Sequence, residues 1–122
     1  ILGKDVDDAI HRAKTYIDSG ADGIMIHSKT NDFSQILSFC DKFKDVKKKV
    51  PLVVVPSTYN KVKEEELIKA GVDIVIYANH LLRSSYPAMV NTAKSILHNK
   101  RCYEASVGCL PIKKVLELIP NE

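Results

Sequence analysis

The feature that most constrains the fold is a short apolar run that occurs three times, each time followed by polar residues. The runs span residues 21–26, 52–55 and 74–77, without regular alternation of polar and apolar side chains. A strand of this kind needs cover on both of its faces. Helical segments separate the runs, so the chain is built from βαβ units. We therefore expect an α/β fold with a parallel sheet and right-handed crossovers.

The segments between the runs have apolar residues at helical spacing. Asp5 can cap the first helix, and Gly20 ends it. The second helix starts at Asn31 or Asp32, and the third ends before Gly71. The apolar positions are Val6, Ala9, Ile10, Ala13, Tyr16 and Ile17 in the first helix, Phe33, Ile36, Leu37, Cys40 and Phe43 in the second, and Leu67, Ile68 and Ala70 in the third.

The last third of the sequence predicts further helices. A longer amphipathic helix follows His80, and Pro111 opens a short helix over residues 112–119. No linker interrupts the chain, so we predict a single domain over residues 1–122. The sequence starts at Ile1 without an initiator Met or a signal peptide, which indicates a piece of a longer protein.

Composition excludes several classes of protein. The chain is 45% hydrophobic and 27% charged, as expected of a soluble domain with a core. Its apolar runs are far shorter than the roughly 20 residues of a membrane span, so no membrane anchor is expected. The net charge is +3, and the lysine run 47–49 fits a solvated turn better than a nucleic-acid patch.

The three cysteines, Cys40, Cys102 and Cys109, have no CxxC spacing. This argues against a disulfide framework or a zinc site and favours a reducing cytoplasm. Cys40 lies on an apolar helix stripe and is predicted to be a core thiol.

Two architectures place polar clusters at the ends of parallel strands. In both a doubly wound fold and a (β/α)8 barrel, the carboxyl ends of the strands form one rim. Three strands cannot close a barrel, which needs about 250 residues, so a barrel implies an absent first part. A doubly wound fold would be nearly complete but normally begins with a strand and a glycine-rich turn, and no GxGxxG motif is present.

A resemblance favours the barrel. The segments Ala-Asp-Gly-Ile-Met-Ile-His-Ser-Lys at 21–29, Pro-Leu-Val-Val-Val-Pro-Ser-Thr-Tyr at 51–59 and Ile-Val-Ile-Tyr-Ala-Asn-His-Leu-Leu-Arg at 74–83 resemble the last three strand ends of the phosphoenolpyruvate phosphomutase family. This family lies in the isocitrate lyase and phosphoenolpyruvate mutase superfamily. The resemblance implies that the chain is the C-terminal part of a (β/α)8 TIM barrel, about strands 6 to 8 with their helices.

The resemblance also implies a function. The full-length parent would be a phosphomutase, an isomerase that interconverts phosphoenolpyruvate and 3-phosphonopyruvate in phosphonate biosynthesis. The nucleophilic Asp, the Mg²⁺ ligands and a substrate-binding Arg are expected upstream of residue 1, so the chain alone should be inactive. Expected partners are the small anionic substrate, the missing N-terminal half and further copies of the chain, but neither nucleic acid nor a membrane. The alternatives are a phosphonopyruvate hydrolase and a non-catalytic half-barrel interaction module.

Four residues are predicted to bind substrate: His27, Ser28, Lys29 and Ser57. The family counterpart of His27 contacts the anionic substrate, whereas the superfamily's lyase branch usually has Glu there. Without the resemblance, His27 could simply be satisfied by backbone groups. Lys29 could steer anions or be solvated, and Ser57 could approach substrate or cap a helix. The family usually has Lys in place of Thr58. No catalytic residue and no metal ligand is predicted in this sequence.

Overall fold

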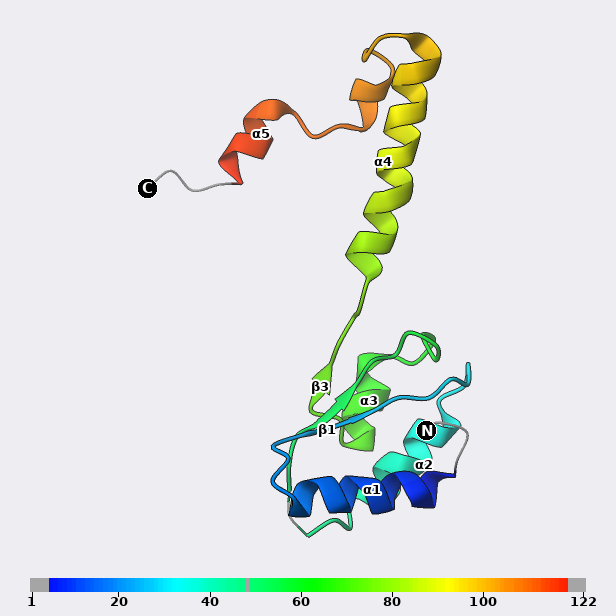
Figure 1. Cartoon of the computed structure of the whole chain (residues 1–122), viewed down its shortest axis with the longest axis vertical. Coiled ribbons are helices and arrows are strands. Elements are labelled where there is room, and N and C mark those ends of the chain that lie inside the picture. The colour runs from blue at the N-terminus through cyan, green and yellow to red at the C-terminus, as the bar shows by residue number, and fades with distance from the viewer. Residues whose placement is uncertain (1–4, 48, 119–122) are drawn as a thin grey trace. The chain divides into compact units, whose positions relative to one another are not determined.

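The chain forms an α/β structure, seen in a computed structural model that describes residues 5–47 and 49–118 (Figure 1). It consists of two compact units, and the boundary between them falls in the sequence between Ala78 and Asn79. The predicted single domain over residues 1–122 stays a prediction. In chain order, the elements are α1 (Val6–Asp18), β1 (Ile24–Ile26), α2 (Ser34–Phe43), β2 (Leu52–Val54), α3 (Glu64–Ala70), β3 (Ile74–Val75), α4 (His80–Asn99), the 3₁₀ helix η1 (Ala105–Gly108) and α5 (Ile112–Glu117).

The first unit contains the predicted parallel sheet, with strand order β1-β2-β3. Ile24 pairs with Leu52, and Val53 pairs with Ile74. The first strand is shorter than the apolar run predicts. The chain reverses at Gly20, whose φ is 102°, and joins the sheet only where Ile24 N donates to Pro51 O at 2.9 Å. Glycine adopts this left-handed conformation at no steric cost.

The helix starts show which polar residues act as caps. Asp5 caps α1 as predicted, because its Oδ1 accepts from Asp8 N at 2.8 Å. The second helix begins later than predicted, at Ser34. Asp32 Oδ1 accepts from Ser34 N at 2.8 Å, and the bonds from Ser34 lower the pKa of the Asp32 carboxyl. Asp32 therefore accepts a hydrogen bond from the first residue of α2, although it lies two positions before the helix begins.

One face of the sheet is buried beneath the helices. Cys40 lies in this core, as predicted, and burial raises the pKa of its thiol to about 11. A single cluster of buried side chains joins the sheet to α1, α2 and α3, and it contains Ala9, Ile10, Ala13, Ile17, Ile24, Ile26, Ile36, Phe39, Cys40, Phe43, Val46, Leu52, Val54, Tyr59, Leu67, Ala70 and Val72.

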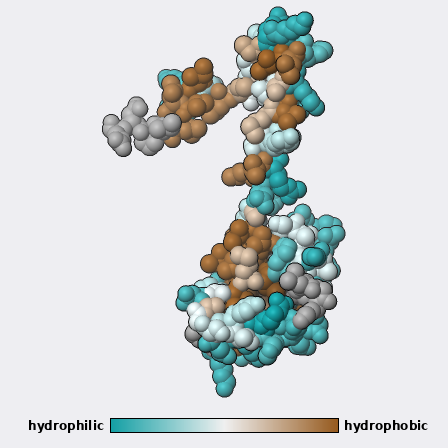
Figure 2. Space-filling model, viewed as in Figure 1, coloured by the Kyte–Doolittle hydropathy of each residue, from teal (hydrophilic) through white to brown (hydrophobic). Residues whose placement is uncertain are grey.

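Within the described part of the first unit, no helix covers the opposite face of the sheet. Met25 is 59% exposed and Ile74 is 46% exposed, although both are apolar. These two residues pair with Val53 in one cross-strand row, so they project to the same side. Figure 2 shows hydrophobic residues gathered over part of this unit's surface. The apolar runs were predicted to need cover on both faces, and the helices of the first unit supply it on one face.

Some residues of the predicted helix stripes lie outside the core. Tyr16 is 54% exposed and Ile68 is 69% exposed. Only one narrow side of each helix faces the sheet. In α3 this side contains Leu67 and Ala70, because residues three apart lie on the same side of a helix. Ile68 lies next to this side rather than on it.

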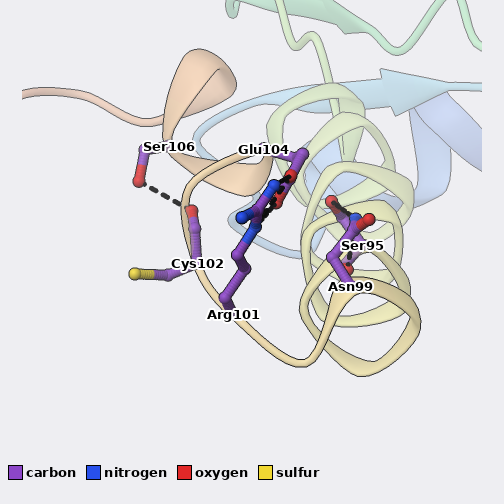
Figure 3. Close-up of polar contacts among 6 residues, drawn as sticks. All are labelled: Ser95, Asn99, Arg101, Cys102, Glu104 and Ser106. Carbon is purple, nitrogen blue, oxygen red and sulfur yellow. Dashed lines mark hydrogen bonds and ion pairs between the residues drawn. The ribbon is translucent and has the colours of Figure 1, made fainter.

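The second unit consists of α4, η1 and α5. None of the residues of α4, all of which the structure describes, is buried. After α4, the chain turns through Lys100, whose φ is 52°. Arg101 Nε donates to Glu104 Oε1 at 3.0 Å, and Ser106 Oγ donates to Cys102 O at 2.8 Å (Figure 3). Throughout the part of the chain that the structure describes, no helix has both the length and the apolar character to cross a membrane.

Candidate functional site

The carboxyl ends of β1 and β2 lie side by side, because the two strands are parallel neighbours. Val55 O, just beyond β2, is the point where two predicted site residues meet. It accepts from Ser57 N at 2.8 Å and lies 3.2 Å from His27 Nδ1. A carbonyl oxygen has two lone pairs and only accepts, so Nδ1 of His27 must carry the hydrogen in this contact. The structure thus brings His27 and Ser57 to the same oxygen.

His27 also faces a cavity along the outer edge of β1. The cavity has a volume of about 380 Å³, and its lining includes His27, Lys29, Arg12 and Tyr16. Arg12 Nε is paired with Asp8 Oδ2 at 2.8 Å, whereas Lys29 is exposed. The cavity therefore brings Lys29 and His27 together at one end of a lining that is otherwise mostly apolar.

Ser28 takes a different position from its neighbours. Its side chain is 1% exposed, and its Oγ donates to Gln35 Oε1 at 2.6 Å. The Ser28 backbone carbonyl accepts from Thr58 Oγ1 at 2.6 Å. Ser28 is therefore engaged inside the protein, and its predicted contact with substrate stays a prediction, as do those of His27, Lys29 and Ser57.

Tyr59 follows the second strand, where its sequence position fits either an approach to substrate or a helix cap, and the structure makes it a buried residue of this region. It is 1% exposed and packs against Phe33 and His27, with ring centroids 5.9 Å and 6.4 Å away. Its hydroxyl lies near the Val55 backbone, but no described residue meets the geometry of a hydrogen bond to it. Burial raises the pKa of Tyr59 to about 12, so the phenol stays neutral at physiological pH.

The sequence also did not predict the contacts that Gln35 and Thr58 make with Ser28. No local pattern identifies them, because their partner Ser28 lies seven and thirty residues away along the chain. The only available signal was that both belong to polar segments next to strand ends.

The residues around Val55 O do not form a magnesium site. Mg²⁺ prefers carboxylate and other oxygen ligands in octahedral geometry. The predicted site residues here are His27, Ser28, Lys29 and Ser57, none of which is a carboxylate. Within residues 5–47 and 49–118, no group of three or more His, Cys, Asp or Glu side chains could hold a metal ion. The donors and cations present suit an oxyanion instead.

The third strand end belongs to a different part of the structure. Asn79 and His80 begin the second unit, and Asn79 has a φ of 65°. Asn79 O accepts from Arg83 N at 2.8 Å in the first turn of α4.

Known proteins resemble the chain along nearly all of its length. A phosphoenolpyruvate phosphomutase from Tetrahymena pyriformis is 33% identical over 118 residues, which cover 97% of this chain and 38% of the relative. A phosphonopyruvate hydrolase from Variovorax sp. is 32% identical over 123 residues, covering 100% of this chain and 41% of the relative. The chain thus spans about two fifths of the length of these relatives.

Solved structures give the same picture. The phosphoenolpyruvate phosphomutase from Streptomyces platensis subsp. rosaceus superimposes with a TM-score of 0.86 at 34% identity, covering 95% of this chain and 39% of that one. A phosphonopyruvate hydrolase in complex with oxalate and Mg²⁺ gives a TM-score of 0.81 at 32% identity, covering 93% of this chain and 39% of that one. The family model for phosphoenolpyruvate phosphomutase matches residues 2–97. The chain belongs to the phosphoenolpyruvate phosphomutase family.

Proposed function

We propose that the chain is the C-terminal part of a phosphoenolpyruvate phosphomutase that interconverts phosphoenolpyruvate and 3-phosphonopyruvate. The observation that carries this proposal is the family match over residues 2–97, which includes all three strand ends. The parent enzyme would then be an isomerase of phosphonate biosynthesis.

The one-sided cover of the sheet supports a TIM barrel, with β1 to β3 as its strands 6 to 8. A doubly wound sheet has helices on both faces. A barrel has helices on the outside only, while the other face of each strand fills the interior. Ile24 and Leu52 face the helices α1, α2 and α3 and share one core with them. Met25 and Ile74 lie on the open face, which would be the barrel interior.

The chemistry of the rim fits an anionic substrate such as phosphonopyruvate. Lys29 supplies an ammonium group, and His27 supplies an N–H donor to the substrate when both of its ring nitrogens carry hydrogen. Ser57, whose backbone N–H bonds to Val55 O, carries a hydroxyl in the same segment. Phosphoryl transfer depends mostly on positioning and on electrostatic stabilisation of the phosphoryl oxygens. These three residues would hold and orient the substrate.

The remaining groups would come from outside this chain. The described residues do not fit Mg²⁺, so the metal ligands are assigned to the rest of the parent protein. The nucleophilic Asp is assigned there by the resemblance to the family. The chain alone should therefore show no turnover. The outer edges of β1 and β3, which are the edge strands of the sheet, would be covered by the rest of the barrel. The complete protein is also proposed to form homo-oligomers. Free thiols at Cys40, Cys102 and Cys109 fit a cytoplasmic location.

A phosphonopyruvate hydrolase is the second candidate. The Variovorax hydrolase is 32% identical over 123 residues, close to the 33% identity of the Tetrahymena phosphomutase. The two reactions share the substrate and differ in whether the phosphoryl group returns to the pyruvyl unit or passes to water.

Phosphorus NMR separates the two reactions. The full-length protein is incubated with phosphonopyruvate and Mg²⁺, and the C–P resonance is followed. A mutase converts it into the phosphate-ester resonance of phosphoenolpyruvate, whereas a hydrolase releases inorganic phosphate. Absence of both products in the full-length protein would refute this proposal, and turnover by residues 1–122 alone would refute the assignment of catalytic groups elsewhere.

His27→Ala tests the substrate contact in the full-length protein. If the imidazole binds the reacting anion more strongly in the transition state, kcat and kcat/KM should both fall by roughly 10²-fold. His11→Ala is the matched control, since His11 is exposed on α1. A His27→Ala protein that is less stable but has normal kcat would remove His27 from the site.

A further inference from the structure

The loop between β1 and α2, which carries His27 and Lys29, is held by a group of partly buried hydrogen bonds centred on the buried side chain of Ser28. Ser28 Oγ lies 2.6 Å from Gln35 Oε1, 2.9 Å from Thr30 Oγ1 and 3.2 Å from Thr30 N. The single hydroxyl hydrogen of Ser28 goes to Gln35, because an amide oxygen can only accept. Ser28 Oγ then accepts from Thr30 N and from Thr30 Oγ1, whose single hydrogen is shared with the longer contact to Asp32 O at 3.4 Å.

A further bond ties this loop to the end of the next strand. Thr58 Oγ1 donates to Ser28 O at 2.6 Å. Gln35 lies in the first turn of α2 and Thr58 follows β2, so two separate elements hold Ser28 from its side chain and from its backbone. A side chain that is 1% exposed and bonded in this way has little freedom to move.

His27 is the residue most affected by this arrangement. It lies between the end of β1 and Ser28, and its Nδ1 is 3.2 Å from Val55 O. Val55 and Thr58 belong to the same segment after β2. The strands pair as far as Ile26 and Val54, and the bond from Thr58 to Ser28 is a further link between the two segments just beyond the His27 ring.

We propose that Gln35 and Thr58, acting through Ser28, are positioning residues that hold the His27 imidazole at the carboxyl edge of the sheet. Their catalytic consequence rests on the proposed function. Neither residue has to touch the substrate. Misplacement of a reacting or binding group by about 1 Å can cost as much as 10²-fold in rate, so loss of either bond should be visible in kcat.

Two pairs of variants separate the hydrogen bonds from the shape of the side chains. Thr58→Val removes the donor to Ser28 O and keeps the branched shape, whereas Thr58→Ser keeps the donor. Gln35→Leu removes the acceptor for Ser28 Oγ, whereas Gln35→Glu keeps an acceptor oxygen. If Gln35→Leu does not fold, the near-isosteric Thr58→Val decides the outcome.

The direct measurement is the ¹⁵N chemical shift of His27 Nδ1 in the full-length protein with labelled histidine, which reports the bond to Val55 O. Thr58→Val and Gln35→Leu should shift this resonance, and Thr58→Ser and Gln35→Glu should leave it near the wild-type position. An unchanged resonance in both disruptive variants would overturn the proposal, whether or not the protein turns over phosphonopyruvate.

Kinetics supply the second measurement. In the full-length protein, Thr58→Val and Gln35→Leu should lower kcat for phosphonopyruvate by roughly tenfold or more with little change in KM. The conservative variants should keep kcat near the wild-type value. A lower melting temperature with an unchanged ring resonance and unchanged kcat would reduce the network to a structural role and overturn the proposal. No turnover in the wild type would refute the proposed function and leave the NMR result to decide the positioning role.

Discussion

Tyr59→Phe should make the protein more stable, because it removes a buried hydroxyl that has no hydrogen-bond partner among the described residues. Tyr59 is 1% exposed, and its ring packs against Phe33 and His27. In the unfolded chain the hydroxyl is hydrated, so folding takes it out of water without replacing the lost bonds. An unsatisfied polar group of this kind costs about 1–3 kcal/mol.

The opposing effect is smaller. Deleting one oxygen atom removes a few dispersion contacts, each of which contributes about 0.1–0.2 kcal/mol. The phenyl ring keeps its place beside Phe33. We therefore expect the free energy of unfolding to rise by about 1 kcal/mol, which corresponds to an increase of about 4–8 °C in melting temperature for a unit of this size.

Urea unfolding followed by circular dichroism measures the effect as a shift of the midpoint at constant slope. The matched control is Tyr77→Phe. The Tyr77 hydroxyl donates to Glu64 Oε1 at 2.6 Å on the surface, so its loss should change stability little and in the opposite direction. If Tyr59→Phe instead lowers the free energy of unfolding by 1 kcal/mol or more, the hydroxyl is hydrogen-bonded in solution and the reasoning is refuted.

The other predictions concern titration, strand pairing and backbone conformation. Burial raises the Cys40 pKa from 9.0 to about 11, so the folded state keeps a proton that the unfolded chain loses. Stability should fall as pH rises from about 9 to 11, and Cys40→Ala should flatten this fall in urea titrations at several pH values. Asp73 Oδ2 accepts from Leu52 N at 2.8 Å, so Asp73→Ala should lower the free energy of unfolding by about 1 kcal/mol, while Asp73→Asn, which keeps an acceptor, should lose less. Gly71 has a φ of 92°, so Gly71→Ala should lower the melting temperature by the equivalent of about 1 kcal/mol. Gly108→Ala is the control and should change it little, and equal effects of the two substitutions would contradict the conformational argument.

Much of the first unit could be predicted from the sequence because the signals are local. The apolar runs identified the positions of β1, β2 and β3, and helical spacing identified the buried residues Ile10 and Ala13. Caps were less predictable. Asp5 acts as expected, but Asp32 lies outside α2, because several neighbouring polar residues could each have started that helix. Strand ends were also imprecise, since pairing with the next strand decides where a strand begins.

In the candidate site, too, some features follow from the local sequence and others depend on the tertiary structure. The sequence by itself determined that polar residues follow β1 and β2, and that His27 and Lys29 lie at a strand end. Only the tertiary structure decided that Ser28 turns inward and that Tyr59 is buried. The physical reason is that these outcomes depend on partners far along the chain. Thr58 and Ser28 are thirty residues apart, and they meet only because the register of β1 against β2 and their shared core bring the two strand ends together.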